Sequence, residues 1–159
     1  MRDLPGDWIR SNYGAHTFSP YDIVGHLLHG ERTDWTRRAR IILDHGEREP
    51  FEPFDRYAMY ELSRGKSLDD LLAEFAEERR QNLAKVRSWA LGRAELDRRG
   101  RHPDPSFPSV TLGQLLAAWV VHDLHHLGQV AKCMARQYTE AVGPWRSYLS
   151  ILNTPLDGG

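Results

Sequence analysis

The chain has 159 residues, 40% of them hydrophobic, so it is long enough to bury the core of about one domain spanning 1–159. Its 21 basic and 22 acidic side chains give a net charge of −1, which argues against nucleic acid or a membrane surface as a partner. The single cysteine, the absence of a signal peptide and the absence of an apolar run of ~18 residues predict a soluble, cytoplasmic protein.

The chain begins with a weak helical pattern over 4–13, which Pro5-Gly6 interrupts, so we expect only a helical stub there. The first strong helix prediction covers 19–45. Ser19-Pro20 is a typical helix start, with a capping side chain followed by a proline at the first helical position. Apolar residues then recur at helical spacing until His45-Gly46, where the pattern ends.

A long connection follows over 46–66, and it contains three aromatic residues: Phe51, Phe54 and Tyr57. A solvated linker does not need such side chains, so we expect this loop to pack on the protein and to cover the mouth of a cleft. Ser67 then starts a second long helix, predicted over 67–91, whose pattern allows an extension to 98.

A proline-rich loop, 99–110, precedes the third long helix, which we predict over 111–138. Thr111 and Gln114 have the spacing of a capping box at its start. A last short helix is predicted over 143–152, laid across the bundle. The sequence shows neither internal repeats nor the alternation of a β-strand, which predicts an all-α protein with an antiparallel helix bundle.

Two histidines of the third long helix suggest half of a metal site. His122 and His126 are four residues apart, so they lie one above the other on the same helix face, whereas His125 points toward the polar side. Neutral imidazole is a common metal ligand. The alternative is that the pair consists only of hydrogen-bonded residues at the boundary of the core.

A third histidine, His26, lies on the flank of the apolar stripe of the first long helix. Gly30, one turn further on the same side, would let a facing helix approach closely, whereas His29 lies nearly opposite the stripe. An antiparallel partner helix could bring His26 to the histidine pair, and three protein ligands would leave a coordination position open for chemistry. Alone, His26 would be an ordinary surface or interface residue.

Two carboxylates, Glu31 and Asp123, map to the middle of apolar helix faces, and buried acids need partners. One interpretation is that each pairs with an arginine or a tryptophan N–H across the bundle. The other is a catalytic role, as support for a ligating histidine or as a general base. Gln129 lies one turn beyond His125 and His126 and could form hydrogen bonds near the site.

The other candidates receive structural interpretations. Cys133 lies two turns beyond His126, about 10 Å along the helix axis, too far from His122 to share an ion with it. We expect it to pack in the core. His16, His45 and His102 lie beside glycines or prolines in loops and are expected to be exposed to solvent.

The combination of these motifs resembles the DinB/YfiT-like superfamily. The resemblance rests on Val24-Gly25-His26-Leu27-Leu28 with Glu31 further on, and on His122-x-x-x-His126-Leu127-Gly128-Gln129. It covers about residues 8–140 and implies a four-helix bundle with one long crossover. The first helix of that superfamily normally has several turns. Here it is shortened, which leaves a short segment, the tail or a partner chain to complete the bundle.

The resemblance further implies a divalent metal, Zn, Ni, Fe or Mn, held by His26, His122 and His126. Characterised members of the superfamily include transferases and isomerases that use low-molecular-weight thiols, the resemblance also implies metal-dependent hydrolysis, and many members form dimers. We therefore expect a metal-dependent enzyme that acts on a small molecule, in which the metal activates a water or a thiol. We also expect the protein to form a homodimer. The alternative is a non-catalytic, stress-related interaction protein in which the metal or the histidine cluster is structural.

Overall fold

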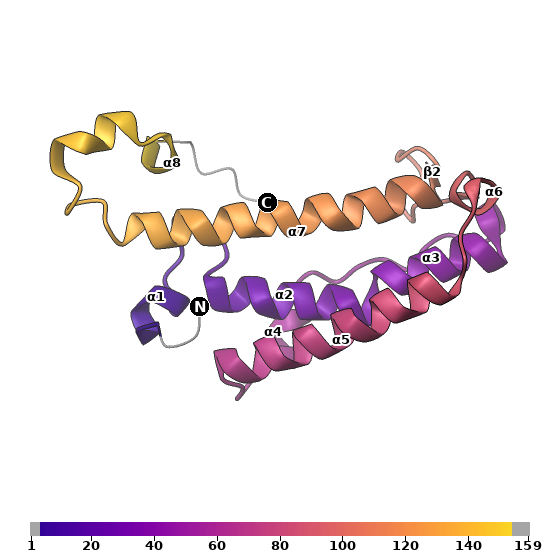
Figure 1. Cartoon of the computed structure of the whole chain (residues 1–159), viewed down its shortest axis with the longest axis horizontal. Helices are drawn as coiled ribbons and strands as arrows, with labels where there is room; N and C mark the ends of the chain where they lie inside the picture. The colour runs from indigo at the N-terminus through magenta and orange to yellow at the C-terminus, as the bar shows by residue number, and fades with distance from the viewer. Residues whose placement is uncertain (1–3, 154–159) are drawn as a thin grey trace.

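The computed structural model describes residues 4–153, and long helices dominate it (Figure 1). α2 (Pro20–Thr33) and α3 (Trp35–Asp44) follow each other along one line, and α5 (Leu68–Ser88) runs beside them in the same direction. α7 (Leu112–Arg136) runs back in the opposite direction. Because α3 and α5 run in the same direction, the chain that connects the end of α3 to the start of α5 must cross the full length of the bundle.

The starts of the long helices follow the sequence closely because each has a capping box. In each box a hydroxyl accepts from the backbone N–H three residues later, and that residue's side chain accepts from the cap's own N–H. The pairs are Ser19 with Asp22, Ser67 with Asp70, and Thr111 with Gln114. These contacts satisfy backbone donors that a helix start otherwise leaves open.

The single helix predicted over 19–45 is wrong, because the chain breaks at Asp34 between α2 and α3. Asp34 has φ −118° and ψ −78°, far from helical values. One local contact favours the break, because the Thr33 hydroxyl donates to the His29 carbonyl and such a bond tends to bend a helix. The Asp34 carboxylate pairs with Arg38 one turn into α3. The extension of α5 to 98 is also wrong, because residues 93–96 form a separate short helix, α6 (Arg93–Leu96).

The crossover over 46–66 packs on the bundle, as predicted. It contains a 3-10 turn, η1 (Gly46–Arg48), and a short helix, α4 (Met59–Ser63). Phe51 is buried, and Met59 anchors the other end in the core. Tyr57 departs from the expectation, since 60% of its surface is exposed.

A two-stranded ribbon, which the sequence does not predict, precedes α7. β1 (Arg99–Gly100) pairs antiparallel with β2 (Val110–Thr111). Strands of two residues are too short for any alternation to be visible. Gly100 lies tightly against the core, since an added Cβ would stand 2.5 Å from Ile42 and 2.8 Å from Phe51. The ribbon therefore fixes the crossover to the end of the bundle.

Two groups of buried apolar residues lie along the bundle. One joins α3, the crossover and the first half of α7, and its members are Trp35, Ala39, Ile42, Phe51, Leu112, Leu115 and Trp119. The other joins α2 and α5, and its members are Tyr21, Val24, Leu28, Leu68 and Leu71. Cys133 is fully buried, as expected for a packing residue.

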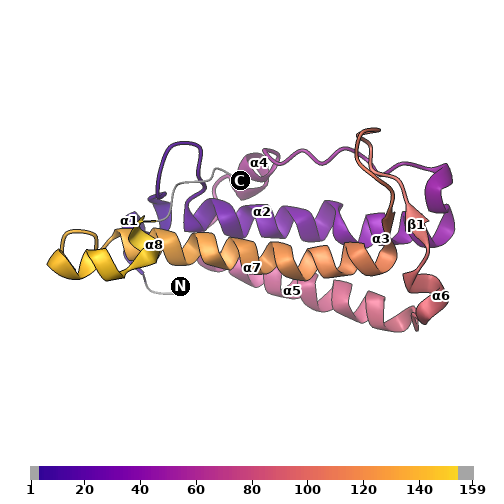
Figure 2. The same cartoon turned by 90° about the horizontal axis from the view of Figure 1, so that it is seen from above.

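The first helix is short, as predicted: α1 (Gly6–Arg10) lies at one end of the bundle. The tail forms a 3-10 segment, η2 (Gly143–Tyr148), and a last turn, α8 (Ser150–Asn153). η2 extends beyond the end of α7, and the chain then turns back so that α8 lies against the last part of α7, with Leu152 buried (Figures 1 and 2). The tail therefore packs on the end of α7 and does not lie across the whole bundle.

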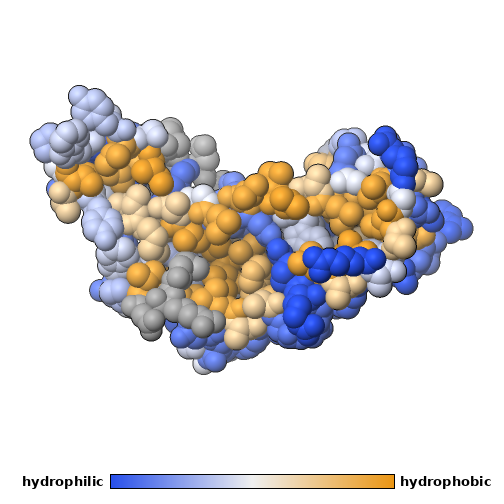
Figure 3. All heavy atoms as spheres, viewed as in Figure 1, coloured by the Kyte–Doolittle hydropathy of each residue, from blue (hydrophilic) through white to orange (hydrophobic). Residues whose placement is uncertain are grey.

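That outer side of α7 is apolar, and apolar residues are visible along it in the space-filling view (Figure 3). Val120, Val121, Leu124 and Leu127 are each about 60% exposed. None of the helices in residues 4–153 has both the length and the apolar composition that crossing a bilayer requires.

Candidate metal centre

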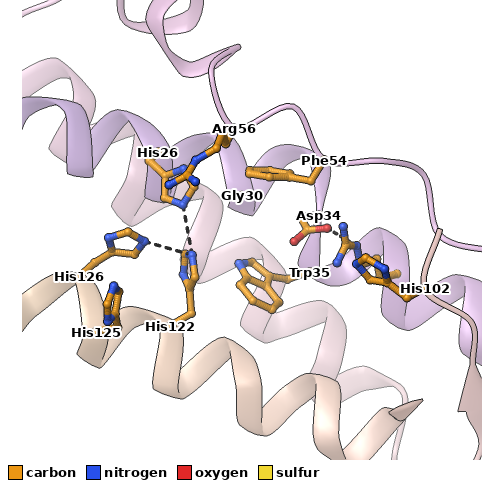
Figure 4. Close-up of a pocket in the computed structure, with 11 residues that line it drawn as sticks. His26, Gly30, Asp34, Trp35, Phe54, Arg56, His102, His122, His125 and His126 are labelled. Carbon is orange, nitrogen blue, oxygen red and sulfur yellow. Dashed lines mark hydrogen bonds and ion pairs between the residues drawn. The ribbon is translucent and has the colours of Figure 1, made fainter. Parts of the chain in front are cut away.

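Three imidazoles from two distant parts of the chain meet between α2 and α7 (Figure 4). The Nε2 atom of His122 lies 3.1 Å from the Nε2 atom of His26 and 3.1 Å from that of His126. Ligands placed tetrahedrally at about 2.0–2.1 Å from one ion would be about 3.3 Å apart. The separation of the three ring nitrogens therefore fits common coordination of one metal ion.

The surroundings keep these imidazoles neutral. Burial lowers the pKa of His26 to about 3 and that of His126 to about 4, and it also lowers the pKa of His122. Each ring adds to the effect, because a proton on one imidazole disfavours a proton on its neighbour. A neutral ring that holds its proton on Nε2 can pair with one neighbour, whereas a metal ion could bind all three Nε2 lone pairs, and the lowered pKa values disfavour the extra proton that would compete with it.

Gln129 sets the orientation of one imidazole. The Nδ1–H group of His126 donates to the side-chain oxygen of Gln129 over 2.7 Å, which leaves the Nε2 lone pair directed at the other two rings. The amide nitrogen of Gln129 donates to His125 over 3.1 Å. His125 is exposed and lies outside the three converging nitrogens, as its place on the helix predicts.

Glu31 and Asp123 lie behind the histidines, where Arg79 of α5 joins them. The guanidinium lies 2.9 Å from Glu31 and contacts both carboxylate oxygens of Asp123, at 2.7 and 3.1 Å. Glu31, whose carboxylate is fully buried, also accepts hydrogen bonds from Trp119 Nε1 at 2.9 Å and Asn82 Nδ2 at 3.0 Å. An arginine and a tryptophan N–H are the partners that the first of the two interpretations predicts for these acids.

A cavity of about 420 Å³ lies beside the three histidines and is open to solvent. Gly30 lies on its wall, where an added Cβ would stand 3.2 Å from the indole nitrogen of Trp35, so glycine keeps this wall open. The other lining residues come from α3, the crossover and the ribbon, as well as from α7: Asp34, Trp35, Arg38, Phe54, Arg56, His102 and His125.

The sequence did not predict the surroundings of two histidines near this cavity, His102 and His29. His102 is half-buried and lines the cavity, so the expectation of a solvent-exposed loop histidine is wrong. His29 is also buried, although it lies nearly opposite the apolar stripe, because Phe54 of the crossover packs on it at a ring distance of 4.9 Å. The aromatic residues of the crossover were the available signal, but they do not reveal which helix face it covers.

The fold and site define a helical-bundle protein with three converging histidines beside an open cavity, an arrangement suited to a metal. The sequence profile of the DinB superfamily matches residues 1–130, and the chain belongs to this superfamily. It is also similar to the structure of YfiT from Bacillus subtilis, described as a probable metal-dependent hydrolase with an unusual four-helix bundle topology. That likeness has a TM-score of 0.71 and 22% sequence identity, and covers 84% of this chain and 75% of YfiT.

The all-α, four-helix bundle type expected from the sequence is therefore confirmed, together with its long crossover and shortened first helix. The comparison with curated proteins finds no significant match. The match to the superfamily does not specify a reaction, because a shared fold hosts different activities.

Proposed function

We propose that this protein is a divalent-metal-dependent enzyme, with His26, His122 and His126 as the ligands and a small molecule bound in the adjoining cavity. The observation that carries the proposal is the convergence of three neutral Nε2 atoms within 4.8 Å of one another. Three protein ligands are the number typical of catalytic zinc sites, which keep one position open.

A bound divalent ion would supply a Lewis acid that lowers the pKa of a coordinated water or thiol and so provides a nucleophile near neutral pH. The residues of the chain would hold the site in place. Gln129 would fix the ring of His126, and the Arg79 network would hold α5 against the part of α7 that carries His122.

Hydrolysis and thiol-dependent transfer are both compatible with this site, because water and a small thiol would compete for the same open position. The chain's own thiol is not suited to this role. Cys133 is fully buried, and burial raises its pKa to about 11. A thiol substrate would therefore have to come from solution, as expected from the family resemblance.

The metal content of the purified protein tests the proposal. We expect about one equivalent of Zn, Ni, Fe or Mn per chain in the wild type after dialysis, and a loss of that metal in His126→Ala. His125→Ala is the matched control, because this histidine is adjacent in sequence but exposed, and it should retain the metal. A wild type that takes up none of the four metals contradicts the proposal, as does a His126→Ala variant that retains full occupancy.

A second candidate is a non-catalytic protein in which the ion is structural. One observation favours it: the three histidines tie α2 to α7, so an ion there would hold the two helices together. Thermal unfolding with and without a chelator, combined with a screen for hydrolysis and thiol transfer, separates the two. A large loss of melting temperature without turnover supports the structural role, whereas metal-dependent turnover supports the enzyme.

A further inference from the structure

We infer that the end of the cavity remote from the three converging histidines is a second subsite, where His102 donates a hydrogen bond to an uncharged oxygen at the far end of an elongated substrate. The inference rests on the proposed function, since it gives the shape and the polarity of a substrate for the same site. It depends on the length of the cavity, the placement of His102 and the paired charges beside it.

The cavity is long enough to contain two subsites. His26 and Asp34 both line it, and at the rise of a helix their positions differ by about 12 Å along the axis. Figure 4 shows the three histidines at one end of the cavity, and Asp34 and His102 at the other. A molecule that reaches both ends is therefore elongated, with a length of roughly 10 Å.

Two aromatic rings lie between these ends, as Figure 4 shows. Trp35 stacks on the buried Trp119 with a ring distance of 6.0 Å and an angle of 9°, and its edge meets His122 at 5.1 Å. Phe54 of the crossover packs on His29 at a ring distance of 4.9 Å. Rings held by such contacts are suited to an apolar body, so the middle of the ligand is apolar.

The backbone beside His102 is tied to the crossover. The carbonyl of Arg101 accepts a hydrogen bond from the N–H group of the buried Phe51 over 2.9 Å. Phe107 packs on the imidazole of His102 with 4.7 Å between the ring centres. These contacts hold the half-buried ring of His102 in the wall of the cavity.

The hydrogen bonds of the loop determine which ring nitrogen of His102 can donate. The backbone N–H group of Asp104 donates to Nδ1 of His102 over 3.1 Å, and the carboxylate of Asp104 accepts from the Ser106 hydroxyl over 2.7 Å, which keeps this turn closed. A neutral imidazole whose Nδ1 accepts a hydrogen bond carries its proton on Nε2. The Nε2–H group is therefore the donor that His102 offers to a ligand.

The charged groups at this end of the cavity are already paired with each other. Asp34 and Arg38 form an ion pair, and both line the cavity. Burial raises the pKa of Asp34, and the charges of Arg38 and His102 act against that rise, which places the three side chains close together. An anion bound here would meet Asp34 and a cation would meet Arg38, whereas an uncharged carbonyl or hydroxyl oxygen can accept from His102 without either conflict.

Two hydroxamates of the same shape test this inference, because a hydroxamate binds zinc and directs a para substituent toward the far end of the cavity. The acetyl group of para-acetylbenzohydroxamate offers an acceptor oxygen, and the isopropyl group of para-isopropylbenzohydroxamate does not. Titration calorimetry with zinc-loaded protein should show that the acetyl probe binds about fivefold more tightly, the effect of one hydrogen bond. In His102→Phe, which keeps a ring but has no donor, we expect this preference to disappear. His102→Gln keeps an N–H group near the place of Nε2 and should retain part of it.

The matched control is His45→Phe, the same substitution at an exposed histidine outside the cavity, and it should keep the full preference. Comparing both probes on one sample cancels any loss of folded protein. The inference is overturned if the wild type binds the two probes equally, or if His102→Phe prefers the acetyl probe as the wild type does. Zinc-free protein separates the two proposals: probes that bind no better with zinc, or not at all, contradict the open metal site and the subsite with it, whereas zinc-dependent binding without a preference contradicts only the subsite.

Discussion

Over residues 120–129 the two sides of α7 differ in a way that reverses the usual distribution of residues, whereas Leu112, Leu115 and Trp119 at the start of the helix are buried as usual. The side that faces α2 and α5 carries polar and ionisable groups: His122, Asp123, His126 and Gln129. The opposite side is apolar and open to solvent, with Val120, Val121, Leu124 and Leu127 each about 60% exposed. Polar groups are therefore found inside and a continuous apolar surface outside.

The difference shows that burial in this helix depends on whether each group finds a partner. On the inner side Asp123 pairs with Arg79, and His126 donates to Gln129. Groups partnered in this way can be buried at little net cost, whereas an exposed apolar surface gains free energy when something covers it. On the inner side Asp123 and His126 thus have partners, although Nδ1 of His122 is buried without one, whereas Val120, Val121, Leu124 and Leu127 on the outer side stay exposed within residues 4–153.

The largest effect is expected when the inner network loses its only arginine. Arg79→Met would leave the carboxylates of Glu31 and Asp123 without their cation, and breaking a buried ion pair on one side costs about 3–5 kcal/mol. We expect a loss of about 3 kcal/mol in the free energy of unfolding, because Arg79 is only partly buried. Urea unfolding measures it.

Arg80→Met is the matched control for this variant. Arg80 is the next residue on α5, but its partner Glu77 and the arginine itself are exposed to solvent. Its unfolding curve should be close to that of the wild type. Equal losses in the two variants would mean that the Arg79 network contributes no more than a surface pair.

The second effect concerns pH and applies to the metal-free protein. His26 and His126 have pKa values near 3 and 4 when folded but about 6.5 when unfolded, so the unfolded chain binds more protons. Stability is therefore full above pH 6.5 and falls as the pH drops toward 4. The expected loss at pH 5 is about 2 kcal/mol for each histidine.

Urea unfolding at several pH values checks this expectation. His26→Gln removes one of the two groups and should make stability less dependent on pH. His45→Gln, at an exposed histidine outside the site, is the matched control. Parallel pH profiles for the wild type and His26→Gln would show that the buried imidazole does not resist protonation.

A third variant tests whether the orientation of the His126 ring affects metal affinity. Gln129→Leu removes the acceptor that orients His126 but keeps all three imidazoles. Loss of such an outer partner typically weakens metal affinity by about 10–100-fold. Competition with a chelator measures that affinity, and His125→Ala, which removes the other partner of Gln129, should change it far less. Unchanged affinity in Gln129→Leu would indicate that packing alone fixes the ring.

The inner side of α7 could largely be predicted from the sequence, because it depends on local rules. Four-residue spacing places His122 above His126, and the capping box with Thr111 fixes where the helix begins. The convergence with His26 needed the family resemblance as well, since spacing within one helix cannot position a residue on another.

The cavity could not be predicted in the same way, because it depends on the path of irregular chain. The break at Asp34 turns the side chains of α3 relative to α2, and the crossover brings Arg56 to a histidine 30 positions earlier in the sequence. The ribbon likewise carries His102 into the wall. Helical periodicity contains no information on such paths.

The last prediction concerns the outer side of α7, where a substitution is expected to change the free energy of unfolding least. We propose that a second copy of the protein covers it, as the homodimer expected from the sequence requires. Within 112–131 the one charged residue is Asp123, which pairs on the inner side, so two copies could meet here without repulsion between like charges. Ala117 and Gly128 are small enough to let two such helices approach closely, and Tyr148 of the projecting tail is 81% exposed.

Leu124→Glu places a charge in the centre of this surface. Because Leu124 is exposed in the single chain, the variant should unfold nearly like the wild type, yet it should elute as a monomer of 18.3 kDa where the wild type has twice that mass. Gln81→Glu adds the same charge to an exposed position of α5 and should remain a dimer. A wild type that is monomeric at all concentrations, or a Leu124→Glu variant that stays dimeric, would contradict the assignment.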